Sequence, residues 1–165
     1  MKRSLVLLTG MLLAIAGYSQ NKTLPSVNIK TLEGQSINVQ SLGQTGKITV
    51  ISFWATWCSP CKKELDAISE VYEDWQKKYD MELVAISTDD ARSAAKVPGV
   101  VQSKGWQYRV LLDSNKELSI AANIQSVPYT FLIDQKGNIV YEHIGYAPGD
   151  EDELEERIAA LAGKK

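Results

Sequence analysis

The sequence predicts an α/β domain in which helices flank a central mixed β-sheet. Apolar runs of strand length alternate with segments whose apolar residues recur at helical spacing, as in "KITVISFWA" followed by residues 59–79. Near each end of the chain, two runs of alternating polarity are joined by a short turn that contains glycine, which indicates a β-hairpin. The two patterns together predict parallel buried strands with antiparallel hairpins beside them.

The first twenty residues differ from the rest of the chain. Basic residues at positions 2 and 3 precede an apolar run over 5–16, and small residues, Gly17 and Ser19, follow at the two positions that a signal peptidase reads. This order is typical of a secretory signal peptide, and the run is shorter than the roughly 18 residues that a membrane-spanning helix needs. We therefore expect residues 1–19 to be a signal peptide and residues 20–165 to form one exported domain.

The charge of the chain argues against a nucleic-acid partner. Its formal net charge is −2, which becomes −4 when the two basic residues of the signal peptide are removed, and no basic patch remains. Acidic residues gather at 150–156, where we expect the first turns of a terminal helix over Gly149 to Leu161. Negative side chains are favourable at a helix N-terminus, so the cluster is interpreted as a solvated helix face.

The remaining elements follow in the order hairpin, βαβαβα, hairpin, helix. Thr88 and Asp89 are expected to cap a helix through residues 89–97, which Pro98 and Gly99 then break or kink. Gly137 is expected in the turn of the second hairpin, where a positive φ is cheap for glycine. The expected strands are 26–34, 35–42, 47–55, 81–88, 108–113, 129–134 and 138–145, and the other helices are 59–79 and 114–124.

Both cysteines of the chain lie in "FWATWCSPCKKE", where a buried strand meets a helix. Unpaired N–H groups and the helix dipole stabilise a thiolate there, so the pKa of Cys58 is expected below the free value of about 8.5. Cys58 is therefore the predicted nucleophile, and Cys61, one turn further on, the predicted resolving cysteine. Pro60 suits the first turn because it has no N–H to leave unpaired, and Ser59 and Pro60 are expected to tune the redox potential.

Other uses of the cysteine pair fit the sequence less well. A staple that closes so short a loop removes little entropy from the unfolded chain. Structural zinc needs about four ligands, and a c-type haem site needs histidine where Lys62 stands. No metal and no separate cofactor is expected. The single histidine, His143, is interpreted as a solvated or satisfied strand residue without a role. Thiol–disulfide exchange remains, since a CxxC pair beside a βαβ pattern is typical of it.

"FWATWCSPC" resembles the active-site segment of the thioredoxin superfamily. "WCSPCKKE" together with "SVPYTFLID" is similar to the TlpA/ResA-type exported thioredoxin-like proteins. The resemblance extends from the hairpin near Ser26 to the last helix, with an inserted helical segment between the strands at 81–88 and 108–113. It implies a thioredoxin-like fold and a thiol–disulfide oxidoreductase whose redox group is the Cys58–Cys61 disulfide.

The resemblance also implies substrate-binding residues. Trp57 packs beside the nucleophile, Pro128 corresponds to a cis-proline that faces the disulfide, and Val127 offers backbone atoms to an extended substrate segment. On general grounds alone a trans bond is expected at Pro128, because only about 5–6% of X-Pro bonds are cis. Tyr129 stands where threonine is common in the family, and it either changes the fit of the substrate or fills space.

Glu64 is the predicted proton acceptor of the site. In thioredoxins an acidic residue in the strand before the motif handles protons for the buried cysteine, and the matching residue here is Ser52, which cannot. Glu64 lies one turn after Cys61 and points toward the same region, as in the "CKKE" of the ResA-type proteins. We expect it to be partly buried, with a raised pKa, and to accept the proton of Cys61. The alternative is an exposed glutamate paired with Lys62 or Lys63.

These inferences predict a periplasmic, monomeric oxidoreductase that reduces disulfides in exported proteins, with apocytochrome c as one candidate client. The resemblance implies a membrane thiol as electron donor. Oxidase or isomerase activity is one alternative, and a copper or zinc carrier is another. A thiol peroxidase would need threonine three residues before a single reactive cysteine, whereas Thr56 lies two residues before Cys58.

Overall fold

A computed structural model describes residues 22–163, so the predicted signal peptide lies outside the described residues. The strands are β1 (Asn28–Thr31), β2 (Ser36–Asn38), β3 (Ile48–Trp54), β4 (Met81–Ser87), β5 (Arg109–Leu112), β6 (Tyr129–Ile133) and β7 (Ile139–Ile144). The helices are α1 (Ser59–Tyr79), α2 (Val97–Lys104), α3 (Glu117–Ala121) and α4 (Asp150–Ala162), with the 3-10 helices η1 (Val39–Gln44) and η2 (Ala94–Lys96). The predicted α/β class is confirmed.

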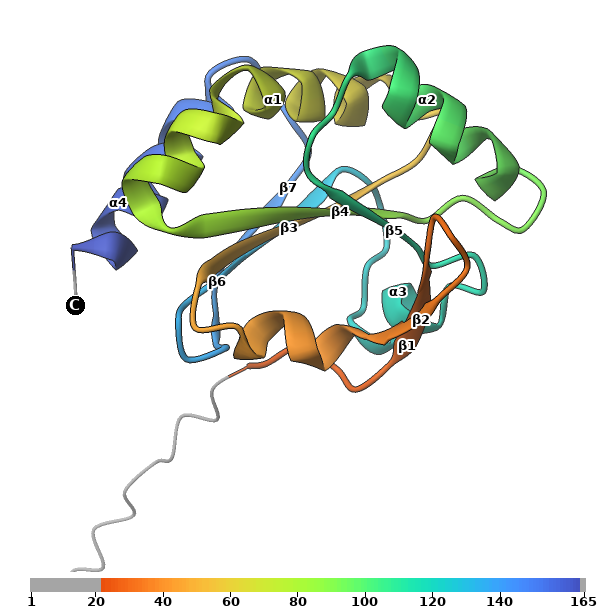
Figure 1. Cartoon of the computed structure of the whole chain (residues 1–165), viewed down its shortest axis with the longest axis horizontal. Coiled ribbons are helices and arrows are strands. Elements are labelled where there is room, and N and C mark those ends of the chain that lie inside the picture. Colours follow the sequence, from red (N-terminus) through yellow and green to blue (C-terminus); the bar gives the residue numbers. More distant parts are fainter. Residues whose placement is uncertain (1–21, 164–165) are drawn as a thin grey trace, which may run out of the picture.

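All seven strands form one mixed sheet in the order β2-β1-β5-β4-β3-β6-β7 (Figure 1). β3, β4 and β5 are parallel, and each outer pair is antiparallel. The central strands β3 and β4 are almost entirely buried, because helices cover both faces of a parallel sheet. This explains why the two strands read as continuous apolar runs. The two predicted hairpins form the opposite edges of the sheet.

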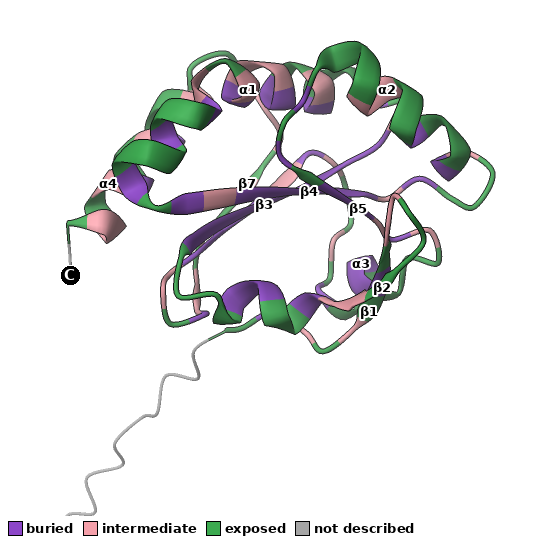
Figure 2. Ribbon diagram, in the orientation of Figure 1, coloured by how far each residue is buried: buried purple, intermediate pink, exposed green. Residues whose placement is uncertain are grey.

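Two hydrophobic cores lie on the two faces of the sheet. Helices α1, α2 and α4 cover one face, and η1 and α3 cover the other (Figure 1), with the buried residues turned toward the sheet (Figure 2). Alternation along β3 sends Val50 and Trp54 to the α1 side and Ile51 and Phe53 to the η1 side. Ser52 has the same parity as Val50 and Trp54, so its side chain faces α1.

Two sequence-based boundaries were wrong. The helix expected through residues 89–97 is replaced by turns and η2, and the helix begins where it was expected to break, because Pro98 lies in the first turn of α2. Proline is suited to that position, since its fixed φ matches a helix and its missing N–H would be unpaired anyway. The run expected as a strand to residue 42 ends at Asn38, whose side chain accepts the N–H of Gln40 at 3.0 Å and starts η1.

The turn of the second hairpin was predicted correctly. Gly137 has a φ of +87°, and a Cβ atom there would lie only 2.7 Å from the carbonyl oxygen of Gly43 in η1. Glycine is therefore needed both for the backbone conformation and for the close contact of the turn with η1. Within residues 22–163, no helix is long and apolar enough to span a membrane.

Candidate active site

The junction of β3 and α1 positions the two cysteines. Cys58 caps α1 with an extended backbone, and its sulfur accepts the N–H of Cys61 at 3.2 Å. The two residues form a disulfide with their Cα atoms 5.4 Å apart. Ser59 and Pro60 lie in the first turn of the helix. Cys58 is 4% exposed and Cys61 is fully buried, so the disulfide reaches the surface on the Cys58 side only.

A buried carboxylate holds the turn that precedes the disulfide. Asp89 accepts the backbone N–H of Thr56 at 2.8 Å and the Thr56 hydroxyl at 2.7 Å, and it also accepts the Ser87 hydroxyl at 2.9 Å. From the other side, the Lys62 ammonium donates to the carbonyl of Thr56 at 3.0 Å. The backbone between β3 and Cys58 is therefore fixed by α1 and by the chain that follows β4.

Sequence reasoning missed this role and expected Asp89 to cap a helix. A signal was present in the pattern. Asp89 is the second residue after β4, a buried strand that runs parallel to β3, and the carboxyl ends of neighbouring parallel strands lie at the same edge of a sheet. A polar residue at the end of β4 is thereby brought to the end of β3, where the turn to Cys58 begins.

Strand β6 brings the proline to the same edge. Phe53 of β3 pairs with Tyr129 of β6 in antiparallel register, so Pro128 lies across from the end of β3. The Val127–Pro128 bond is cis, as the resemblance implies. Pro128 is buried, and its carbonyl accepts the N–H of Gly145 at 2.9 Å.

Trp57, which directly precedes Cys58, and Val127, which directly precedes Pro128, line the same depression. Trp57 is 71% exposed although it is a large apolar residue. The rest of the depression is polar for the most part, with residues such as Lys116 and Gln125. The predicted substrate-binding residues are therefore brought together, and their role stays a prediction.

Glu64 is buried more deeply than the sequence predicted, with 4% of its surface exposed. One carboxyl oxygen accepts the hydroxyl of Ser52 at 3.0 Å, and the other accepts that of Thr130 at 2.6 Å. These two residues pair across β3 and β6 and both face α1. The alternative of an exposed glutamate paired with Lys62 or Lys63 is wrong, because none of the ion pairs among residues 22–163 includes Glu64.

Burial raises the pKa of the Glu64 carboxyl above its ordinary value, and the hydrogen bonds from Thr130 and Ser52 oppose this shift only in part. A buried carboxylate without a cation is costly, so the acid holds its proton to a higher pH than an exposed glutamate does. Glu64 and Cys61 are both buried on the same face of α1, one turn apart. The arrangement can therefore pair a buried thiol with a buried acid.

No group of three or more histidine, cysteine or acidic side chains suited to a metal ion occurs in residues 22–163. The two sulfur atoms are bonded to each other. The redox group of this site is the disulfide itself.

A disulfide at a helix N-terminus, next to a cis-proline at the edge of a mixed sheet, defines a thioredoxin-like thiol–disulfide oxidoreductase. Comparison with known proteins agrees with this class. Residues 21–142 match the AhpC/TSA family, and the chain belongs to that family.

Two solved structures and one curated relative illustrate the similarity. The thiol-disulfide oxidoreductase ResA of Bacillus thuringiensis (strain Al Hakam) is 32% identical over 124 residues, which are 75% of this chain and 69% of the relative. An uncharacterized thioredoxin-like protein from Porphyromonas gingivalis is 42% identical with a TM-score of 0.77, covering 86% of this chain and 92% of its own. StoA from Bacillus subtilis is 28% identical with a TM-score of 0.64, covering 80% of this chain and 98% of its own.

Proposed function

We propose that this protein reduces disulfides in exported proteins, with Glu64 as the proton acceptor for Cys61. The observation that carries the proposal is the buried carboxyl of Glu64, one turn from Cys61 and bound only by two hydroxyl groups among the described residues. Cys61 supplies the group that attacks the mixed disulfide, and Glu64 supplies the base that accepts the proton of Cys61.

The reaction starts with the reduced protein. The Cys58 thiolate attacks one sulfur of a client disulfide, which forms a bond between Cys58 and the client and releases the second client sulfur as a thiolate. Cys61 then gives its proton to Glu64, and its thiolate attacks the sulfur of Cys58. The client leaves with both sulfurs reduced, and two electrons have passed from the protein to the client.

The depression lined by Trp57 and Val127 is the proposed client site. An extended client segment would lie along Val127, and Trp57 would contact the residues that flank the client cysteine. Ile144 of β7 is 62% exposed and pairs with Tyr129, the residue that follows Pro128. Two exposed apolar side chains, those of Trp57 and Ile144, therefore belong to the segments around the cis-proline. Exposed apolar groups of this kind are suited to bind a partly unfolded client.

The protein needs a second partner, because each cycle leaves Cys58 and Cys61 oxidised. We propose a membrane thiol protein as the electron donor and the periplasm as the compartment. Cysteines of apocytochrome c are the first client to test, since haem attachment requires them in reduced form. The protein would act as a monomer.

The reduction potential of the Cys58–Cys61 pair tests the direction of the reaction. We expect a value near or below that of thioredoxin, about −270 mV, in equilibrium with a dithiothreitol series. A value near −120 mV, where strong periplasmic oxidants lie, would instead assign disulfide formation to the protein. As a control, Cys61→Ser should accumulate a mixed disulfide between Cys58 and the client, whereas Cys58→Ser should form none.

Two further measurements test the rest of the proposal. Mass spectrometry of the protein recovered from the periplasm should show a chain that begins after residue 19 or 20, and a retained N-terminal segment would contradict cleavage. The purified protein should turn over hydrogen peroxide negligibly. The Thr56 hydroxyl is bound to Asp89 at 2.7 Å, so it is not available to a peroxide at Cys58.

A further inference from the structure

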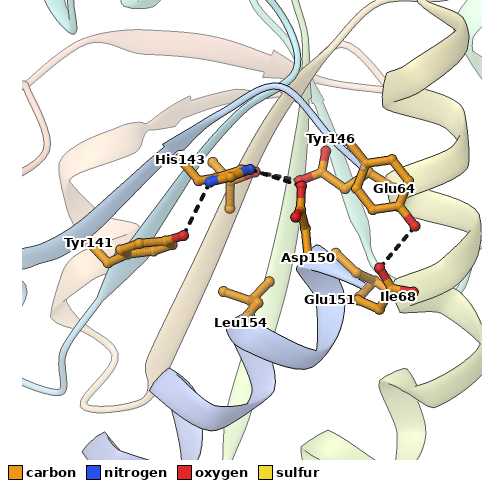
Figure 3. Close-up of a pocket in the computed structure, with 9 residues that line it drawn as sticks. Glu64, Ile68, Tyr141, His143, Tyr146, Asp150, Glu151 and Leu154 are labelled. Carbon is orange, nitrogen blue, oxygen red and sulfur yellow. Dashed lines mark hydrogen bonds and ion pairs between the residues drawn. The ribbon is translucent and has the colours of Figure 1, made fainter. Parts of the chain in front are cut away.

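Glu64 has a second approach from solvent, away from the cysteines. A narrow cleft reaches its carboxyl between α1, the strands β6 and β7, and the start of α4 (Figure 3). Neither Cys58 nor Cys61 lines this cleft, which has room for about one water molecule. The side chains of His143 and Asp150 stand at its outer part, since about 30% of each is exposed, whereas Glu64 is buried.

The imidazole of His143 is held from both sides. One ring nitrogen lies 3.0 Å from the carboxylate of Asp150, and the other lies 3.2 Å from the hydroxyl of Tyr141 (Figure 3). Asp150 is itself fixed, because it accepts the backbone N–H of Ala147 at 2.7 Å. The orientation of the ring is therefore set by β7 and by the first turn of α4, and both elements line the cleft.

The charged groups around the imidazole are mostly acidic. Asp150, Glu151 and Glu153 face the cleft or the ring from α4, and Glu64 faces it from α1. Arg157 of α4 lies over the Tyr141 ring at 3.9 Å and pairs with Glu153 at 2.6 Å. The other titratable groups are the phenols of Tyr141 and Tyr146. Histidine is the residue type that most often relays protons in proteins, and among the groups that line this cleft it is the one suited to that role.

A buried acid that takes a proton in every cycle must also release it. The hydrogen-bond partners of Glu64, Ser52 and Thr130, carry hydroxyl groups that do not titrate in water. His143 is the single histidine of the chain and lines the same cleft as Glu64. A positive charge on His143 also lowers the pKa of Glu64, although burial remains the larger influence. The two groups are therefore electrostatically coupled.

We propose that His143, oriented by Asp150 and Tyr141, is the group through which Glu64 exchanges its proton with solvent in each redox cycle. The inference rests on the proposed role of Glu64. The proton leaves the Cys61 thiol for the Glu64 carboxylate, passes through a water molecule in the cleft to the neutral imidazole, and leaves to the solvent. No electrons move in this step, and re-reduction of the disulfide runs the same path in reverse. His143 is a positioning residue in this scheme, since it acts through Glu64.

Chemical rescue tests the relay. The His143→Ala protein is mixed in reduced form with a disulfide peptide at low buffer concentration, and the resolving step is followed by stopped-flow fluorescence. We expect this step to slow by about tenfold, less than the 10²–10⁴-fold typical of direct proton transfer. Added imidazole should restore the rate, because the substitution leaves space for it in the cleft. Glu156→Gln, exposed on α4 and without a side-chain hydrogen bond or ion pair to the described residues, should match the wild type with and without imidazole.

The outcomes separate the two proposals. A slow Glu64→Gln protein together with an unaffected His143→Ala protein would overturn the relay and leave the role of Glu64 intact. Slowing that imidazole does not restore would assign His143 a structural role and would also overturn the relay. Unaffected rates in both variants would overturn both proposals. In the double variant, the loss of His143 should cause no further slowing.

His143→Gln covers the case in which the alanine variant fails to fold. Glutamine can still bond to Asp150, but it does not titrate. We expect the pH–rate profile of the resolving step to lose one inflection relative to the wild type. An unchanged profile in a folded His143→Gln protein would overturn the relay.

Discussion

Two carboxylates are buried close to the active-site turn, Asp89 at 1% exposure and Glu64 at 4%, and their partners differ. Asp89 accepts one backbone N–H and two hydroxyl groups, all from Thr56 and Ser87. Glu64 accepts two hydroxyl groups and no N–H. A backbone N–H can only donate, whereas a hydroxyl can donate or accept. The surroundings of Glu64 therefore suit the acid in either protonation state, while one oxygen of Asp89 faces a backbone N–H and must remain an acceptor.

The difference separates a carboxylate suited to a structural role from one suited to the proton exchange that we propose for Glu64. Asp89 fixes the turn through its hydrogen bonds. If the oxygen that accepts the N–H of Thr56 carried a proton, two donors would face each other there. Glu64 can release and take a proton while Ser52 and Thr130 rotate their hydroxyl hydrogens. The comparison predicts that the two residues fail in different ways when they are replaced.

The largest effect is expected from Glu64→Gln. Glutamine keeps the shape and the hydrogen bonds but cannot accept the proton of Cys61, so the resolving step should slow by about 100-fold. The measurement is stopped-flow exchange with a disulfide peptide, together with titration of the cysteine thiols. Glu70→Gln, exposed on the same helix, should behave as the wild type. Unchanged thiol pKa values and exchange rates in Glu64→Gln would show that Glu64 does not accept the proton of Cys61, and the contrast with Asp89 would be lost.

Asp89→Asn should show the opposite pattern. The amide keeps an acceptor for the N–H of Thr56 but loses the negative charge that strengthens the three hydrogen bonds from Thr56 and Ser87, which should cost about 1–3 kcal/mol. We expect the free energy of unfolding in urea to fall by that amount, with a smaller loss of exchange rate than in Glu64→Gln. Asp74→Asn, exposed on α1, is the matched control. An unchanged free energy of unfolding together with a lost exchange rate would instead assign Asp89 a role in proton transfer.

The sequence was sufficient for the parts of this site that follow from local spacing. The position of Cys58 at a strand–helix junction follows from the period of the apolar residues on either side. The placement of Glu64 near Cys61 follows from one helical turn. The full burial of Glu64 was not predictable in the same way, because it depends on Thr130, which β6 contributes from 66 residues away.

Asp89 and His143 show why the rest could not be predicted. Asp89 was expected to cap a helix, because an acidic residue before a helical segment commonly has that role. Its hydrogen-bond partners instead belong to β4 and to the turn after β3. His143 was interpreted without a role, because a single strand residue has no pattern of its own. It lines the same cleft as Glu64 only because β7 and α4 come together there. At both positions the surroundings are made by tertiary contacts, which local spacing does not show.

The pH dependence of stability sharpens the comparison further. Burial raises the pKa of Glu64 above 4.5 in the folded protein, so the folded state binds a proton that the unfolded chain has released. Stability at this site therefore falls as the pH rises from about 4.5 through the raised value. In Glu64→Gln this loss is absent. The variant should match the wild type at pH 4 and exceed it at pH 8 by on the order of 1 kcal/mol.

Urea unfolding at pH 4, 6 and 8, with the disulfide kept oxidised, measures this difference. Asp89→Asn should show no comparable gain at high pH, because its partners are suited to an acceptor. A difference in stability between Glu64→Gln and the wild type that is the same at all three pH values would mean that the carboxyl is not penalised by burial. In that case hydroxyl groups alone would be enough to hold the charge.

Trp57→Ala should have the smallest effect, because Trp57 takes no part in the proton chemistry that distinguishes the carboxylates. Its side chain is 71% exposed, so its removal should change the free energy of unfolding by no more than about 0.5 kcal/mol. The proposed contact with the client predicts a several-fold higher client concentration at half-maximal rate, with an unchanged resolving step. Val140→Ala, 47% exposed on β7, should change neither. A slower resolving step in Trp57→Ala would mean that the aromatic ring acts on the cysteines themselves, and client binding and proton transfer would then no longer be separable in this site.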